Sequence, residues 1–289
     1  MTEDTVFQEK YYTSHNGLKL YYRDYCNGGS DKTPLLCLHG LTRNAKDFDR
    51  FARHFASDRR VISLDMRGRG KSAYDPNYKN YQIPVYGQDV LSCLAQEGLD
   101  QVIAVGTSMG GLISMAIGAA KPCIFKAIIL NDIGPEINPE GLKRIAGFVG
   151  NGITLPNWNV AIMGIKALCS PLFPDYQADD WELFTRNTFR ELDDGTIIAD
   201  YDQAIGTAMK EATATVVPVD LWNLFKDIGQ IPVMTLRGEN SDILSHETLE
   251  RMAQEHPQFT PLTVPDRAHT PDLNEDISLR EIRQFIDQV

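Results

Sequence analysis

The chain has 289 residues, 43% hydrophobic and 23% charged, and its 28 basic and 39 acidic side chains give a formal net charge of −11 at pH 7. This length and composition allow one large core, with or without an inserted segment, and the acidic balance disfavours nucleic acid and anionic membrane surfaces as partners. The N-terminus lacks the basic and apolar regions of a secretory signal, and the most apolar stretch, Met109 to Ala120, is too short to span a bilayer.

The cysteines are scattered, odd in number and without CxxC spacing. Such usage favours reduced, buried thiols over disulfides or a zinc site, so we expect a cytoplasmic protein with no metal. The five residues are Cys26, Cys37, Cys93, Cys123 and Cys169.

The chain begins with a predicted antiparallel hairpin. Two strand-like runs, Gln8 to Thr13 and Leu18 to Tyr25, flank Asn16-Gly17, and Asn-Gly is a strong hairpin signal. We expect this hairpin at a sheet edge, with His15 as a solvated turn residue.

A buried strand, Pro34 to Leu38, comes next and ends in His39-Gly40. A strand that ends in His-Gly before a loop can present a backbone N–H to an oxyanion, and glycine lets the chain pass close to a substrate. The following stretch, Asp47 to Ser57, has apolar residues at helical spacing and predicts an amphipathic helix.

The strand Arg60 to Met66 leads into a loop rich in glycine and arginine that extends to Ser72. The loop has part of a phosphate-binding fingerprint, but no helical run follows it. We therefore interpret it as a tight loop pinned by Asp65 and Arg67. A helix from Val85 to Glu97 should follow.

The centre of the chain predicts a nucleophile elbow at Gly106-Thr107-Ser108-Met109-Gly110. A buried strand, Gln101 to Thr107, precedes the serine, and a helix to Ala120 follows it. A serine at the tip of such a strand–turn–helix needs strained backbone and small neighbours. Ser108 is therefore the candidate nucleophile.

One more strand, Ala127 to Leu130, completes a series in which strands and helices alternate. This alternation predicts an α/β fold with a mostly parallel sheet flanked by helices. Ligands bind such sheets beyond the carboxyl ends of the strands, where His39-Gly40 and Ser108 both lie.

Strand patterning fades between residues 134 and 218, where proline interrupts short helical pieces. We expect an all-helical insertion that covers the site as a cap, with a small turn or hairpin at Asp193-Asp194-Gly195-Thr196. Its aromatic and methionine residues are candidates for pocket lining or for packing onto the sheet: Phe148, Trp158, Met163, Phe173, Trp181 and Met209.

The sheet resumes at Ile231 to Leu236, and Asp242 lies in the loop beyond it. A helix from Ser245 to Glu255 and a last strand, Phe259 to Val264, come next. His269 lies in the loop beyond that strand, where a core histidine is unexpected. His246 and His256 are predicted to be surface residues of a helix.

Ser108, Asp242 and His269 supply the three parts of a nucleophilic triad. A serine hydroxyl needs an imidazole base, and the imidazole needs a carboxylate that fixes its tautomer. The backbone N–H groups of Met109 and Leu41 would form the oxyanion hole. Asp132 is the alternative acid, although it could instead order the loop entering the cap, and Glu239 and Asp266 are more distant choices.

Taken together, these motifs resemble the α/β-hydrolase fold superfamily, in particular its single-cap serine hydrolases. The resemblance covers essentially the whole chain and implies an eight-stranded, mostly parallel sheet, no cofactor, Ser108 as nucleophile, His269 as base and Asp242 as acid. Related epoxide hydrolases and haloalkane dehalogenases carry aspartate at the elbow, which argues against those activities. We expect a core formed by residues 1–133 and 219–289 and a cap formed by residues 134–218.

We therefore expect the protein to be a hydrolase that cleaves a small-molecule carboxylic ester, lactone or thioester through an acyl-enzyme intermediate. One alternative uses the same triad on a carbon–carbon bond in a ring-cleavage diketone and needs a site for a second carboxylate. The candidates for that site are Arg43, Arg144, Arg186 and Arg190. The other alternative is a ligand-binding receptor or pseudo-enzyme on the same fold.

Overall fold

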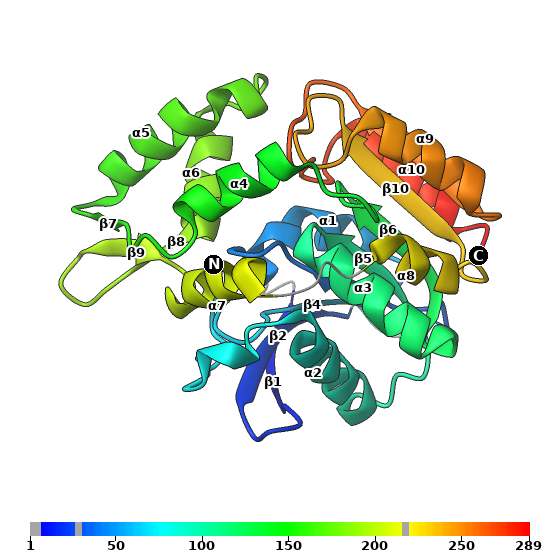
Figure 1. The fold of residues 1–289 in the computed structure, drawn as a ribbon. Helices are drawn as coiled ribbons and strands as arrows, with labels where there is room; N and C mark the ends of the chain where they lie inside the picture. The colour runs from blue at the N-terminus through cyan, green and yellow to red at the C-terminus, as the bar shows by residue number, and fades with distance from the viewer. Residues whose placement is uncertain (1–6, 27–30, 216–219) are drawn as a thin grey trace.

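The computed structural model describes residues 7–26, 31–215 and 220–289 and is built around an eight-stranded sheet with the order β1-β2-β4-β3-β5-β6-β10-β11 (Figure 1). The pairs β1·β2 and β2·β4 are antiparallel, and all other neighbours are parallel. The strands are β1 (Gln8–Thr13), β2 (Lys19–Tyr25), β3 (Leu35–Leu38), β4 (Val61–Leu64), β5 (Val102–Thr107), β6 (Phe125–Asn131), β10 (Val233–Gly238) and β11 (Phe259–Val264).

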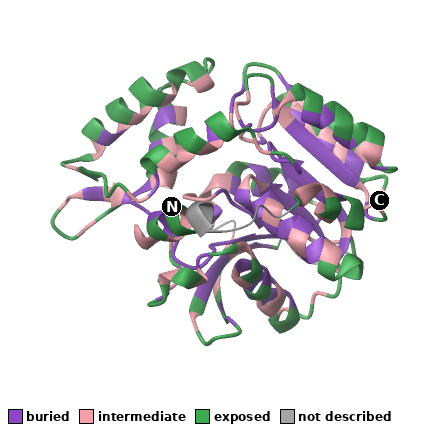
Figure 2. Ribbon diagram, in the orientation of Figure 1, coloured by how far each residue is buried: buried purple, intermediate pink, exposed green. Residues whose placement is uncertain are grey.

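Helices cover both faces of the sheet, which explains why the central strands are continuous apolar runs. All residues of β3 and β4 are buried, and Figure 2 shows buried residues along much of the sheet. One core layer includes side chains of α2 (Ile83–Gln96), α3 (Met109–Ala120), α8 (Leu221–Asp227) and α9 (His246–Glu255), and the other includes α1 (Asp49–Phe55) and α10 (Asp276–Ile286). The predicted fold class is confirmed.

The register of the parallel strands brings their carboxyl ends together. Leu38 of β3 pairs with Gly106 of β5, and Thr107 of β5 pairs with Asn131 of β6. Asn131 pairs in turn with Leu236 of β10. The loops that follow these four strands therefore begin side by side at one edge of the sheet.

Most of the segment between β6 and β10 lies in a separate layer above that edge, which we call the covering layer (Figure 1). Its helices are α4 (Pro139–Phe148), α5 (Trp158–Cys169), α6 (Ala178–Thr188) and α7 (Ala204–Thr215). The assignment of residues 134–218 to a cap domain stays a prediction, and its boundary at residues 218 and 219 lies outside the described residues.

This layer is not all-helical. A small antiparallel sheet of order β7-β9-β8 is formed by β7 (Thr154–Leu155), β8 (Phe189–Glu191) and β9 (Ile197–Ala199). Gly195, with φ of 83°, makes the turn between β8 and β9, and the β-branched pair after it favours extended structure. The hairpin predicted at this turn is confirmed, whereas the expectation of helices alone is wrong.

Short 3₁₀ turns connect several elements: η1 (Ala45–Phe48), η2 (Tyr78–Asn80), η3 (Pro122–Ile124) and η4 (Ser170–Leu172). No helix within the described ranges is long and apolar enough to cross a membrane.

The prediction that His256 is a surface residue is wrong. It lies at the C-cap of α9, 4% exposed, and its ring packs 5.1 Å from that of Phe225.

The turn from β5 into α3 is as tight as the sequence predicts. Ser108 has φ of 50° and ψ of −111°, a region that L-residues rarely occupy. A Cβ on Gly106 would lie 2.5 Å from the carbonyl of Gly110, and a Cβ on Gly110 would lie 2.0 Å from the carbonyl oxygen of Leu38. Backbone atoms on both sides thus exclude any side chain at these two positions.

We predict that Gly110→Ala lowers the free energy of unfolding by about 3 kcal/mol or more, because the β3 backbone cannot move aside. Gly164→Ala in α5 is the matched control, since nothing lies within 4 Å of its Cβ position. The control should gain about 0.5 to 1 kcal/mol from helix propensity. Urea denaturation followed by circular dichroism measures both, and equal stability of the two variants would contradict the packing analysis.

Candidate active site

Ser108 lies directly beyond β5, at the N-terminus of α3. Its N–H donates to the carbonyl of Asn131 at 2.9 Å, and its own carbonyl accepts from the N–H groups of Gly111 and Leu112. These backbone bonds fix the elbow, so that the hydroxyl group lies at the carboxyl edge of the sheet, next to a helix terminus that favours negative charge.

His269 reaches Ser108 from the loop after β11. Its Nε2 lies 3.1 Å from Ser108 Oγ, and its Nδ1 lies 2.7 Å from Asp132 Oδ2. Because a carboxylate only accepts, Nδ1 carries the proton and Nε2 is left as the acceptor for the serine hydroxyl. The three side chains form one continuous chain of hydrogen bonds.

Asp132 is held by the loops around it. It is completely buried, one residue beyond β6, and its N–H donates to the carbonyl of Leu236 at 2.7 Å. Oδ1 accepts from the N–H of Gly238 at 2.8 Å, and Oδ2 accepts from Ser241 Oγ at 2.6 Å as well as from His269. Three donors therefore fix the carboxylate that orients the imidazole.

The expectation that Asp242 contacts His269 is wrong. Asp242 makes a bidentate ion pair with Arg144 of α4, at 2.5 and 2.8 Å, and this ion pair holds the pKa of the carboxyl below its ordinary value. It is Ser241 that turns toward the site. The order of the strands explains this difference, because β6, which Asp132 directly follows, lies between β5, which leads to Ser108, and β10, which leads to Ser241. Asp132 therefore reaches the His269 imidazole more directly than Asp242 does.

The N–H groups predicted to form an oxyanion hole lie in the loop after β3 and at the start of α3. Met109 is the first residue of α3, so its N–H has no partner within the helix. His39 orients the peptide between Gly40 and Leu41: its Nδ1 lies 2.7 Å from the Gly40 oxygen, while its Nε2 accepts from the N–H of Met66 at 3.0 Å. Since carbonyl and N–H of a trans peptide point in opposite directions, the Leu41 N–H is oriented by the same contact.

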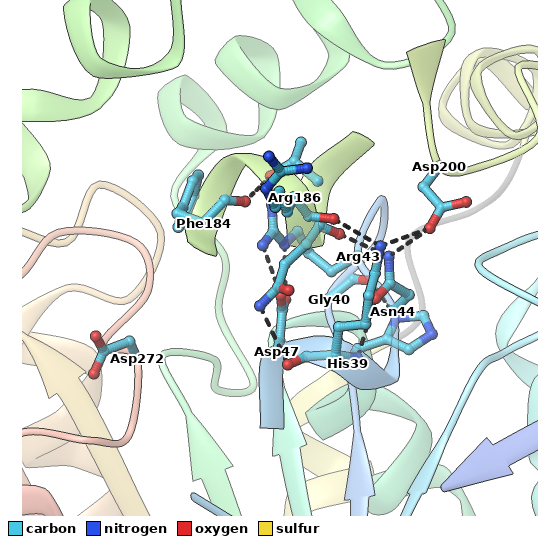
Figure 3. Close-up of polar contacts among 12 residues, drawn as sticks. His39, Gly40, Arg43, Asn44, Asp47, Phe184, Arg186, Asp200 and Asp272 are labelled. Atoms are coloured by element: carbon cyan, nitrogen blue, oxygen red, sulfur yellow. Dashed lines mark hydrogen bonds and ion pairs between the residues drawn. The ribbon is translucent and has the colours of Figure 1, made fainter. Parts of the chain in front are cut away.

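The segment that follows Leu41 is attached to the layer above (Figure 3). Asn44 Nδ2 donates to the Asn187 carbonyl at 2.8 Å, and Lys46 Nζ lies 3.0 Å from Asp200 Oδ2. Arg43 forms a bidentate pair with Asp47 at 2.6 and 2.7 Å. The loop that contains Leu41, a residue predicted to supply an oxyanion donor, is thereby held between the sheet and the covering layer.

A cavity of about 650 Å³ opens above Ser108 and His269. The part of the cavity wall that the covering layer forms is largely apolar, and its apolar residues are Phe148, Ile153, Ile165, Leu168, Leu172, Phe173, Leu183 and Phe184. Arg43 and Arg144 also line it, whereas Arg186 and Arg190 are not among the lining residues. Asp272 adds a carboxyl group, whose pKa is raised to about 6 by burial and by the neighbouring Glu275.

Two contributors to the site were missed by the sequence interpretation. Ser241 supports Asp132, and Arg69, from the loop expected to be only a tight turn, donates from Nε to the carbonyl of Leu41 at 2.9 Å. The pinning role predicted for Asp65 is confirmed, since its carboxylate accepts from the N–H groups of Ala45 and Lys71. A signal for Asp132 did exist in its position directly after the strand that follows the elbow.

We predict that His39 makes stability depend on pH, because burial, and next the charge of Arg69, lower its pKa from 6.5 to about 3. Between these values the unfolded chain binds a proton that the folded chain excludes, so folding stability falls as pH falls below 6.5. At pH 5 this difference amounts to about 2 kcal/mol.

Urea titrations at pH 7.5 and 5 should show a smaller pH-dependent loss for His39→Gln than for the natural chain. His246→Gln is the control at an exposed histidine and should retain the full loss. An unchanged pH dependence in His39→Gln would contradict the assignment of a neutral, buried imidazole.

Comparison with known proteins identifies the family of this chain. Residues 33–273 match the alpha/beta hydrolase fold family. The chain is 28% identical to the 3-hydroxybutyrate-oligomer hydrolase of Cupriavidus necator, over 92% of this chain and 93% of that protein. It is 26% identical to the 2-(acetamidomethylene)succinate hydrolase of Mesorhizobium japonicum, over 88% and 87%. The crystal structure of an alpha/beta hydrolase from Novosphingobium aromaticivorans superposes with a TM-score of 0.93 and 38% identity, covering 99% of this chain and all of that one. The chain therefore belongs to the alpha/beta hydrolase fold family.

Proposed function

We propose that this protein hydrolyses a carboxylic ester of a small molecule through an acyl-enzyme intermediate on Ser108. The observation that supports this most directly is the chain of hydrogen bonds from Ser108 Oγ through His269 to Asp132. It unites a nucleophile, a base in the required tautomer and a carboxylate that orients the base.

In the acylation step, Ser108 Oγ attacks the ester carbonyl carbon while its proton passes to His269 Nε2. Asp132 stabilises the imidazolium, and the N–H groups of Leu41 and Met109 stabilise the oxyanion. When the tetrahedral intermediate collapses, the leaving alkoxide takes the proton from His269. A water molecule then attacks the acyl-enzyme with His269 as base, releasing the acid and returning the proton to Ser108.

We further propose a substrate that combines a linear apolar chain with a carboxylate. One relative is named as a hydrolase of 3-hydroxybutyrate oligomers, which are chains of esters with a terminal carboxyl group. The other is named as a hydrolase of a succinate derivative, which also carries carboxylates. The apolar wall suits the chain. Arg144 suits the carboxylate, because it is half exposed within the cavity lining and its partner Asp242 can be exchanged for a substrate anion.

We predict that Asp132→Asn lowers kcat for p-nitrophenyl butyrate by about 10³- to 10⁴-fold, because the imidazole loses the partner that fixes its tautomer. Asp242→Asn should lower kcat by less than about tenfold, since its carboxylate does not contact His269. Steady-state kinetics, with circular dichroism to confirm folding, measure both variants.

The same proteins are then treated with a fluorophosphonate and analysed by peptide mass mapping, with Ser108→Ala as the unlabelled control. A single adduct on Ser108 of the natural chain is expected. Loss of activity in Asp242→Asn with retention in Asp132→Asn would reverse the assignment of the acid. A folded natural chain that takes no label and turns over no ester would favour the receptor interpretation.

We predict that Arg144→Met raises KM for the linear dimer of 3-hydroxybutyrate by about tenfold, because a charge-assisted contact to the carboxylate is lost. KM for its neutral methyl ester should change by less than about threefold, so the methyl ester is the matched substrate control. An equal change for both substrates would exclude Arg144 as the carboxylate site. Cleavage of a ring-cleavage diketone, with no turnover of either ester, would favour the carbon–carbon alternative.

A further inference from the structure

Two arginines of the loop after β4 are completely buried, but they differ in what compensates their charge. Arg67 pairs with two carboxylates, Asp75 at 2.5 Å and Asp89 at 2.5 and 2.6 Å. Arg69 has no carboxylate within 4 Å in the parts of the chain that the structure describes. An arginine so deeply buried without an anion is unusual, because an unpaired charge in the interior is unfavourable by several kcal/mol.

The contacts of Arg69 lead to both residues proposed to form the oxyanion hole. Nε donates to the carbonyl of Leu41 at 2.9 Å, and Nη2 lies 3.6 Å from Met109 Sδ. Nη1 donates to the Arg67 carbonyl at 2.8 Å and to Tyr86 Oη at 2.9 Å. One planar cation thus connects the loop after β3 to the first residue of α3.

We infer that Arg69 is a positioning residue for the oxyanion hole and that its buried charge stabilises the anion formed there, an inference that rests on the proposed function. It acts through Leu41 and Met109, since it does not line the substrate cavity.

The physical basis is a difference between ground state and transition state. The ester substrate is neutral at its carbonyl, so the Arg69 charge has no anion to attract before the reaction begins. When the carbonyl oxygen becomes an oxyanion, the low dielectric of the site makes the attraction strong. Interactions that exist only in the transition state raise kcat and leave ground-state binding unchanged.

The surrounding charges permit this role. His39 is neutral over the working range because burial lowers the pKa of its imidazole to about 3. The Asp202 carboxylate accepts from the hydroxyl group of Tyr81, whose ring centroid lies 5.7 Å from the Arg69 guanidinium, and the carboxylates around Arg67 are bound to the guanidinium of Arg67. Within the ranges that the structure describes, no group neutralises the Arg69 charge on the side of Leu41 and Met109.

The test compares Arg69→Met, Arg69→Gln and Arg69→Lys with Tyr86→Phe, which removes one hydrogen bond of Arg69 but keeps its charge. Three quantities are measured: kcat and KM for p-nitrophenyl butyrate, the inhibition constant of butaneboronic acid, and the Kd of the same ester in a Ser108→Ala background. The boronate forms a tetrahedral anion on Ser108 and reports on the oxyanion hole. The Kd of the intact ester reports on ground-state binding.

We expect Arg69→Met and Arg69→Gln to lower kcat by about 10- to 100-fold and to weaken boronate binding by a similar factor, with KM and Kd changed less than about threefold. Arg69→Lys should retain most of the activity because it keeps the charge. Tyr86→Phe should stay within about threefold of the natural chain. If Arg69→Met does not fold, the comparison of the Gln and Lys variants decides.

Equal losses in kcat and in ground-state affinity would show a merely structural role and overturn the inference. So would a neutral variant that binds boronate as tightly as the natural chain. These results leave the proposed function intact, whereas a natural chain that neither turns over ester nor binds boronate would overturn the proposed function and this inference with it.

Discussion

The arrangement of the site depends on one buried carboxylate, that of Asp132. It accepts hydrogen bonds from the backbone N–H of Gly238 at the end of β10, from Ser241 in the loop after β10 and from His269 in the loop after β11. Its own position, one residue beyond β6, is set by the parallel register with β10. Because a buried charge must be satisfied by donors, the loops close around Asp132, and their closure places His269 beside Ser108.

The covering layer is more than a wall of the cavity, because its later part is joined to the loops beside the proposed oxyanion hole. The Gly70 N–H donates to the Asp200 carbonyl at 3.0 Å, and Arg69 and Tyr201 form an isolated β-bridge. Asp200 also pairs with Lys46 of η1, which follows β3. Its earlier part is joined to the loop after β10 by the Arg144–Asp242 pair, which is about half exposed. Exposed ion pairs contribute little stability, so the two attachments differ in strength.

The arginines that line the cavity and the arginines of the loop beneath it have different electrostatic partners. Arg43 and Arg144 line the cavity, and each forms an ion pair with a neighbouring aspartate. Arg67 binds its carboxylates below the site and stabilises the loop after β4. Arg69, in the same loop, has only neutral partners among the described residues and lies against the proposed oxyanion donors. Two arginines in adjacent turns of one loop thus have different chemical environments, which spacing in the sequence does not reveal.

The amino-acid sequence by itself determined the alternating strands and helices, the elbow at Ser108 and the loop histidine His269, because these depend on local periodicity, glycine placement and turn chemistry. Only the tertiary structure showed that Asp132, and not Asp242, lies within hydrogen-bond distance of His269. Both lie in loops beyond strands, and the choice depends on which strands are neighbours and on where each side chain points. The burial of His256 was decided in the same way, by aromatic side chains of α8 and β11 that pack against it. Local patterns specify elements, whereas contacts between residues far apart in the chain arise only when the elements pack.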